Sequence, residues 1–185
     1  MRPLAAALAA VLFAAPAAAQ EHEHEVDWQE YVYPELGVAK EFPLRPSPAV
    51  GRYQTEVVGA DPAPANIYFV ELGDVTVQMT VVDLRLPEHV AKAANILAEC
   101  VFLAEADGLP LANLPLKAED GSEQGVLGRV VSVDLNYNLG VRQTACLHTK
   151  GRLYKIEGTM VHPIAEDGDL IARFVTSQRF DVGGN

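Results

Sequence analysis

The histidines and cysteines of this sequence are the side chains best able to bind a metal or to take part in catalysis. Two of the five histidines stand close together, in the segment Gln20-Glu21-His22-Glu23-His24. If the mature chain begins at Gln20, its free amine, two backbone amides and the His22 imidazole resemble the amino-terminal copper/nickel motif. That set is square planar, as Cu(II) and Ni(II) prefer. The candidate metal site therefore consists of Gln20, Glu21, His22 and His24.

The residues before this segment have the three parts of a secretory signal. Arg2 gives a positive start, Leu4–Ala15 is an apolar run, and Ala17–Ala19 supplies the small residues that a signal peptidase requires. The run is too short to span a bilayer, which takes about 20 apolar residues. We expect residues 1–19 to be a signal peptide and the protein to be periplasmic. A cut after Gln20, or cyclisation of that residue, removes the metal site and leaves a polar spacer.

Cys100 and Cys146 are the only cysteines. Cys100 falls on the apolar stripe of a predicted helix, and Cys146 falls in the middle of a predicted strand. An even pair in an oxidising compartment favours a disulfide. The alternative is two separate buried thiols. A bridge requires Cα atoms about 4.4–6.8 Å apart, and the absence of a Cys-x-x-Cys motif gives no support to a redox enzyme.

The other histidines and the hydroxyls form no recognisable catalytic motif. His89 and His162 are predicted to be surface or cap residues, and His148 lies in a strand. Ser132 and Ser177 are present, but no Gly-x-Ser-x-Gly turn exposes a serine. Phosphate-binding and dinucleotide-binding glycine motifs are also absent. The sequence therefore predicts no catalytic residue and no cofactor besides the N-terminal metal, and a hydrolase of unfamiliar type stays an alternative.

The composition limits the partners. Without residues 1–19 the chain has 13 basic and 25 acidic residues, a net charge of −12. Such a chain is repelled by phosphate backbones and by anionic membrane surfaces. We expect no nucleic-acid partner and no stable membrane insertion, which leaves an unknown protein or a small ligand.

Hydrophobic patterning predicts mostly strands. A long helix is predicted over Glu88–Asp107, with Pro87 at its start and Gly108 and Pro110 after it. A short helix is predicted from Asp167 or Asp169 through about Ser177. Strands are predicted near residues 28–33, 38–42, 50–58, 67–71, 75–84, 126–136, 140–149 and 153–160, and the sheet is expected to contain about seven strands.

This order of elements predicts an α+β fold with a mostly antiparallel sheet, one long helix and one short C-terminal helix. The strands Val75–Leu84 and Val126–Leu135 are apolar on both faces, so we expect the sheet to be covered on both sides. Residues 20–27 are predicted to be a flexible acidic tail, residues 28–182 a single domain, and residues 183–185 a frayed end.

Two short motifs resemble those of secreted PsbP-like proteins. The first is the hairpin Tyr31–Pro43, aromatic-x-aromatic-Pro-x-x-Gly-Val-x-x-x-Phe-Pro, and the second is the Phe-x-x-Ser-x-x-Phe segment Phe174–Phe180. The chain is also similar to small uncharacterised exported proteins of Gram-negative bacteria. The PsbP resemblance implies an α/β/α sandwich around an antiparallel sheet. It also implies a binding or assembly factor, and it carries over no catalytic residue.

The sequence therefore favours an exported, soluble, non-enzymatic binding or accessory protein whose ligand is unknown. Aromatic side chains are favoured anchors at binding surfaces, so Trp28, Tyr31 and Tyr33 form the candidate surface, with core or lid positions as their alternative. The competing hypotheses are a periplasmic metal-handling protein that uses the N-terminal histidines, and the hydrolase.

Overall fold

The computed structural model describes residues 26–59, 61–115, 126–135, 140–162, 168–180 and 182. None of the helices in these ranges has the length and apolarity needed to cross a membrane. A 3-10 turn at Pro34–Leu36 joins the first two strands. The elements follow in the order β1 (Gln29–Tyr33), β2 (Val38–Phe42), β3 (Ser47–Tyr53), β4 (Ala63–Leu72), β5 (Val75–Asp83), α1 (Pro87–Val90), α2 (Ala93–Ala106), β6 (Leu109–Pro115), β7 (Leu127–Leu135), β8 (Gly140–Thr149), β9 (Arg152–Val161), α3 (Gly168–Thr176) and β10 (Arg179–Phe180).

Seven of the described strands form one sheet in the order β3-β4-β5-β9-β8-β7-β6, and every neighbouring pair is antiparallel. The β4–β5 hairpin is closed by Gly73, whose φ of 56° is a left-handed conformation that glycine adopts without steric cost. A second, three-stranded sheet has the order β1-β2-β10. In this small sheet β10, near the end of the chain, pairs with β2 of the first hairpin. No sequence motif predicted this pairing.

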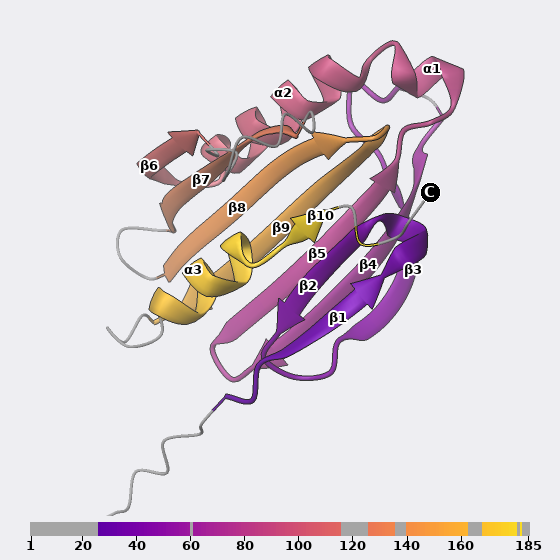
Figure 1. Cartoon of the computed structure of the whole chain (residues 1–185). Coiled ribbons are helices and arrows are strands. Elements are labelled where there is room, and N and C mark those ends of the chain that lie inside the picture. The colour runs from indigo at the N-terminus through magenta and orange to yellow at the C-terminus, as the bar shows by residue number, and fades with distance from the viewer. Residues whose placement is uncertain are drawn as a thin grey trace, which may run out of the picture.

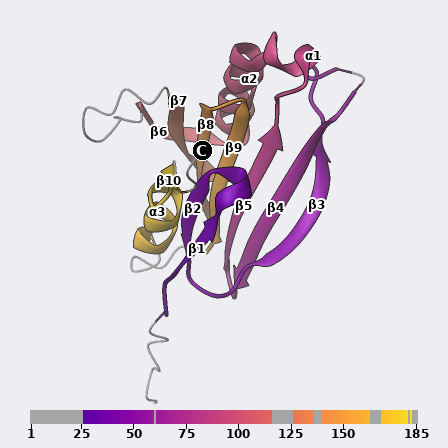
Figure 2. The same ribbon diagram turned by 45° about the vertical axis from the view of Figure 1, so that its right-hand side comes forward.

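The large sheet separates two outer layers. Along β5, Val77 and Met79 point to the side of α3 and the small sheet, whereas Val82 points to the side of α2. Figures 1 and 2 show α3, β1 and β2 on one side of the sheet and α2 toward the other. The structure thus confirms the α+β fold, the mostly antiparallel sheet and the helices on both of its sides. It adds that one outer layer contains a small sheet as well as a helix.

Aromatic side chains hold the mixed outer layer on the large sheet. The ring centroids of Phe42 from β2 and Phe174 from α3 are 5.2 Å apart. The Tyr154 hydroxyl on β9 donates a 2.7 Å hydrogen bond to the carbonyl oxygen of Leu36. α3 crosses β9 at Gly158, where an added Cβ would lie 2.8 Å from the Cβ of Ile171. Only glycine permits this approach without displacing the helix.

The other layer contains a helix that is broken near its start. A single helix was predicted over residues 88–107, and this prediction is wrong, because α1 ends at Val90 and α2 begins at Ala93. The Lys92 amide donates to the carbonyl of His89, three residues back, and the Lys92 Nζ donates to the carbonyl of Val58. The helix is therefore interrupted at Lys92, by a tighter turn and by the hydrogen bond from Lys92 to a residue outside the helix.

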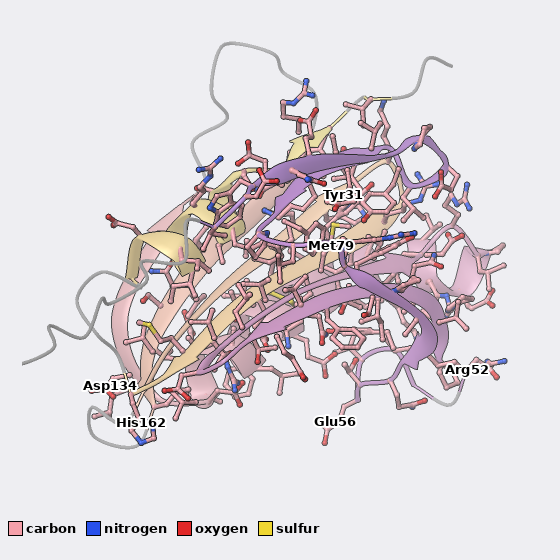
Figure 3. The ribbon with its side chains drawn as sticks, turned by 90° about the horizontal axis from the view of Figure 1, so that it is seen from below. Tyr31, Arg52, Glu56, Met79, Asp134 and His162 are labelled. Carbon is pink, nitrogen blue, oxygen red and sulfur yellow. A yellow bond between two sulfur atoms is a disulfide. The ribbon has the colours of Figure 1, made fainter. Side chains whose placement is uncertain are left out.

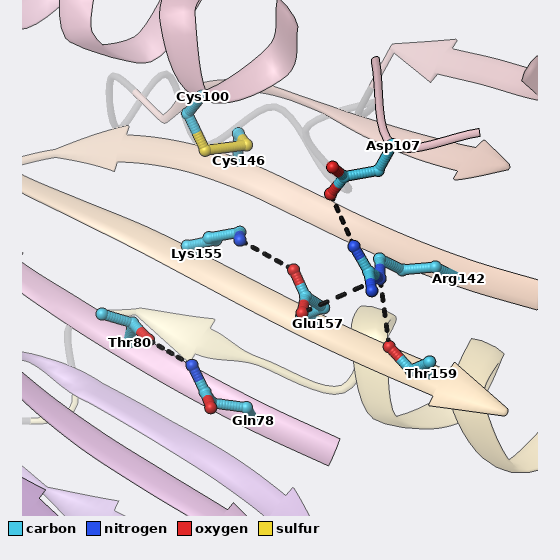
Figure 4. Close-up of polar contacts among 9 residues, drawn as sticks. All are labelled: Gln78, Thr80, Cys100, Asp107, Arg142, Cys146, Lys155, Glu157 and Thr159. Carbon is cyan, nitrogen blue, oxygen red and sulfur yellow. Dashed lines mark hydrogen bonds and ion pairs between the residues drawn. A yellow bond between two sulfur atoms is a disulfide. The ribbon is translucent and has the colours of Figure 1, made fainter. Parts of the chain in front are cut away.

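α2 is attached covalently to the sheet. Its buried side chains, Ile96, Cys100 and Ala104, recur every four residues and face the strands. Cys100 forms a disulfide with Cys146 of β8, and their Cα atoms are 6.1 Å apart. The disulfide predicted from the sequence is therefore confirmed, and Figure 4 shows it joining the helix to the strand below.

Candidate functional site

The predicted metal-binding segment lies outside the described residues. Gln20, Glu21, His22 and His24 all precede residue 26, so the copper or nickel site stays a prediction. In the part of the chain that the structure describes, no group of three His, Cys, Asp or Glu side chains is placed to hold a metal ion.

The predicted aromatic surface is half-buried. The guanidinium carbon of Arg173 lies 4.5 Å from the centroid of the Trp28 ring. The other two rings pack on aromatic neighbours: Tyr31 on Phe42 of β2, and Tyr33 on Tyr68 of β4. Their centroid distances are 5.9 Å and 4.3 Å. All three predicted residues contact the core cluster on this side of the sheet, so their rings cover the core, which is the alternative that the sequence left open.

The structure does not bring together the residues that left a hydrolase open as an alternative. His148 faces the α2 side of the sheet, as Cys146 does, whereas Ser132 is on the opposite face of β7. Burial lowers the pKa of His148, and its Nε2 has no hydrogen-bond partner among the described residues. His162 Nδ1 is 4.0 Å from a carboxylate oxygen of Asp74, at an exposed position. Figure 3 shows His162 at the end of the sheet opposite to Arg52.

His89 is not at the surface position that was predicted for it. Its side chain is 1% exposed rather than on the surface. The Nε2 atom lies 3.1 Å from the carbonyl oxygen of Asp61, in the segment between β3 and β4. His89 therefore links that segment to α1.

Lys40 is a buried charge-bearing group that sequence reasoning missed. The side chain is 0% exposed, and its Nζ donates to the Ser177 hydroxyl at 2.9 Å and lies 4.3 Å from the centroid of the Phe174 ring. Burial places its pKa well below the ordinary lysine value, and the nearby Glu41 opposes this shift. The Ser177 hydroxyl is directed to the carbonyl oxygen of Phe174 at 3.3 Å. These contacts join β2 to the end of α3 in the mixed outer layer. They also occupy the Ser177 hydroxyl, so it is not available as a nucleophile.

Polar residues cross the α2 side of the central strands β8 and β9. We call Arg142, Lys155, Glu157 and Thr159 the polar ladder. Lys155 Nζ is 2.8 Å from Glu157 Oε2, an ionic contact rather than an aligned hydrogen bond, and Arg142 Nε donates to the Thr159 hydroxyl at 3.2 Å. Arg142 also pairs with Asp107 at the end of α2 (Figure 4). The ladder thus anchors the C-terminal end of the helix.

The ladder could have been predicted from the alternation of polar and apolar residues along one strand. In β9, Lys155, Glu157 and Thr159 occupy every second position, while the intervening Tyr154 and Ile156 enter the core. The strands expected to be apolar on both faces were those at residues 75–84 and 126–135, and the ladder lies on two other strands, β8 and β9. Gln78 and Thr80 extend the same polar face onto β5, where they are hydrogen bonded to each other at 3.0 Å.

The outward side of α2 has few charges and is largely apolar. The helix has only two charged residues, Glu99 and Glu105. Phe102 is 66% exposed and is the sole exposed aromatic residue in the described part of the chain. We call the exposed side of this helix the α2 face, and it consists of Ala94, Asn95, Ala98, Phe102, Leu103 and Ala106. An exposed and largely apolar helix side of this kind is a candidate binding surface.

Two open hollows flank the α2 face. Hollow 1 has a volume of about 400 Å³, and its lining residues are Ala94, Leu97, Ala98, Val101, Gly128 and Arg129. Hollow 2 has a volume of about 470 Å³, and its lining residues are Gln54, Thr55, Glu56, Glu99, Phe102 and Leu103. Each hollow combines helix side chains with residues from one neighbouring segment, which is β7 for hollow 1 and the segment after β3 for hollow 2.

Contacts along its length hold α2 rigid. The Glu99 carboxylate accepts a hydrogen bond from the Val57 amide at 3.2 Å, which fixes the wall of hollow 2. The disulfide at Cys100 fixes the middle of the helix, and the ion pair of Asp107 with Arg142 fixes its end. A partner docking on the α2 face would therefore meet a preformed surface, which lowers the entropic cost of binding.

These features define the class of this protein: a three-layer α+β protein with an apolar, outward-facing helix surface between two hollows. Among solved structures, the chain is similar to the solution structure of cyanobacterial PsbP (CyanoP) from Synechocystis sp. PCC 6803. The identity is 11%, the TM-score is 0.47, and the alignment covers 90% of this chain and 99% of that chain. This likeness concerns the fold alone. No family model matches the chain, and no curated protein matches its sequence.

Proposed function

We propose that this chain is an exported, non-enzymatic binding protein that docks a polypeptide partner on the α2 face. The observation that supports this function is the position of Phe102, which is 66% exposed on a rigid helix between two hollows. Exposed aromatic side chains on preformed surfaces are common anchors of protein interfaces.

The shape of the surface favours a polypeptide over a small molecule. Sites for small molecules enclose most of the ligand surface, usually 70–90% or more of it. Both hollows here are open to solvent and lie on opposite flanks of one helix. A partner that covers the α2 face and enters both hollows makes contacts that a small ligand in either hollow does not.

The leader and the disulfide support export. Residues 1–19 have the parts of a secretory signal, and the Cys100–Cys146 disulfide is of a kind that persists in oxidising compartments. We expect the intact mass of the protein isolated from a periplasmic extract to correspond to a chain that starts at Gln20 and lacks two hydrogens at the cysteines. A full-length or fully reduced mass would contradict export. A different start would leave export standing but would remove the metal geometry at His22.

Photo-crosslinking tests the docking surface directly. With a photoactivatable residue at Ala98, on the α2 face at hollow 1, we expect one discrete adduct after illumination of the exported protein in cells. The same residue at Val32, which is 51% exposed on β1 in the other outer layer, is expected to give none. Adding Phe102→Glu to the Ala98 variant should remove the adduct, because a carboxylate cannot fill an apolar contact without a desolvation penalty.

The interpretation of that experiment depends on the fold of each variant. Phe102 is mostly exposed, so Phe102→Glu should leave the thermal unfolding midpoint nearly unchanged. Adducts of equal yield at positions 98 and 32, or an adduct that survives Phe102→Glu in a folded protein, would show that the α2 face is not the docking surface.

A further inference from the structure

We infer that the partner on the α2 face is a second copy of this chain, in a symmetric dimer whose two α2 helices run parallel. This inference rests on the function proposed above and names its partner. It follows from three properties of the same surface: a protruding side chain, a hollow of fitting composition, and charged rims of opposite sign.

The protruding side chain is Phe102 and the fitting hollow is hollow 1. Helical side chains lean toward the N-terminus over the preceding turn, so the Phe102 ring lies at about the level of Ala98. Hollow 1 is at this level, and its helix residues include the small side chains Ala94 and Ala98 beside Leu97 and Val101. One chain therefore carries both an aromatic knob and an apolar hollow with small residues at its floor.

The positions of the hollows select the symmetry. Relative to the buried stripe of α2, the residues of hollow 1 and those of hollow 2 fall on opposite flanks of the helix. A two-fold axis that runs between two parallel α2 helices places hollow 2 of each copy against hollow 1 of the other. Phe102 then enters hollow 1 of the partner twice. In an antiparallel pair, each hollow would face the same hollow of the other copy. Phe102, which lies beside hollow 2, would then not face hollow 1 of the partner.

The rims of the two hollows carry opposite charges. Arg129 stands at hollow 1 and Glu56 at hollow 2, and both side chains are exposed. Neither forms an ion pair with another described residue. Figure 3 shows Glu56 projecting away from the body of the molecule. In the parallel dimer, Arg129 of each copy faces Glu56 of the other, which sets orientation more than affinity.

The test is the self-association of the mature chain, residues 20–185, by sedimentation equilibrium from about 1 to 300 µM, a range that covers micromolar affinities. We expect a reversible dimer. Phe102→Glu should raise the dissociation constant by about thirty-fold or more, as removal of an interface anchor does. Val32→Glu adds the same charge to the opposite layer and should change nothing. Arg129→Glu and Glu56→Arg should each weaken the dimer by up to about five-fold, and the double reversal should restore it.

Each other outcome overturns a defined part of the inference. A monomer at every concentration, or a dimer that folded Phe102→Glu and Ala98→Arg variants both retain, excludes the second copy on this face. A dimer that the double charge reversal does not restore excludes the parallel arrangement. If the crosslink from position 98 has the mass of one copy plus another protein, the proposed function stands and the second copy is ruled out.

Discussion

We expect the mature chain without the Cys100–Cys146 disulfide to lose about 4 kcal/mol in its free energy of unfolding. The two cysteines are 46 residues apart, and closing a loop of that length in the unfolded chain removes conformational entropy equivalent to about 4 kcal/mol at 25 °C. The measurement is denaturant unfolding of the Cys100→Ala/Cys146→Ala double variant against the parent. For a domain of this size the midpoint of thermal unfolding should fall by about 8–16 °C.

The matched control separates the crosslink from the packing of the two side chains. Both cysteines are buried, so alanine also removes two sulfur atoms from the core beneath α2. The parent protein in a strong reductant keeps those atoms and lacks only the bond. If the reduced parent is as stable as the oxidised one, the bond does not stabilise the fold, and the loss in the alanine variant comes from packing. A large loss in both is the expected result.

Replacing Lys40 by Met should stabilise the protein at neutral pH by about 1–4 kcal/mol, as replacement of buried ionic groups by apolar side chains often does. The side chain is fully buried, and its described contacts include hydrogen bonds but no carboxylate at ion-pair distance. Burial lowers the pKa of the folded-state lysine, whereas the unfolded lysine holds its proton up to about pH 10.4. The unfolded chain therefore binds more protons below that pH, and the stability of the parent rises with pH through this window.

The difference between variant and parent isolates this group from all other titrations. The stability advantage of Lys40→Met should shrink as the pH approaches 10.4 and should be largest toward the lower end of the window. Lys155→Met is the control with the opposite sign, because it leaves the buried Oε2 of Glu157 without its ionic contact. A Lys40→Met variant that is less stable than the parent by the same amount at every pH would show that Lys40 carries no burial penalty.

Several elements were predictable from the sequence because their signals are local. The strands predicted over residues 75–84, 140–149 and 153–160 from apolar, β-branched runs and turn residues lie close to the observed bounds of β5, β8 and β9. An apolar repeat at helical spacing gave the buried stripe of α2, with Cys100 in it. The disulfide followed from an even cysteine count and an oxidising compartment, and the structure confirms it. These signals act within a few residues along the chain, so a single sequence contains them.

The candidate site was not predictable in the same way. The sequence directed attention to Trp28, Tyr31 and Tyr33, and all three rings turned out to pack against the core. For the long helix, helical spacing identified only the buried stripe, and it did not point to the opposite side, where Phe102 is exposed. Whether a side chain on an apolar helix is covered depends on which other layers exist above it. That is a property of the assembled layers rather than of the helix.

The sequence alone therefore determined the α+β class, the strand pattern and the pairing of the two cysteines. These follow from hydrophobic periodicity and residue chemistry, which are properties of short stretches of the chain. Only the tertiary structure decided that the end of the chain adds β10 to β2, that Lys40 is enclosed between β2 and α3, and that α2 keeps one apolar side open. Each of these depends on contacts between residues far apart in sequence. The burial and exposure that they produce are fixed only when the layers pack.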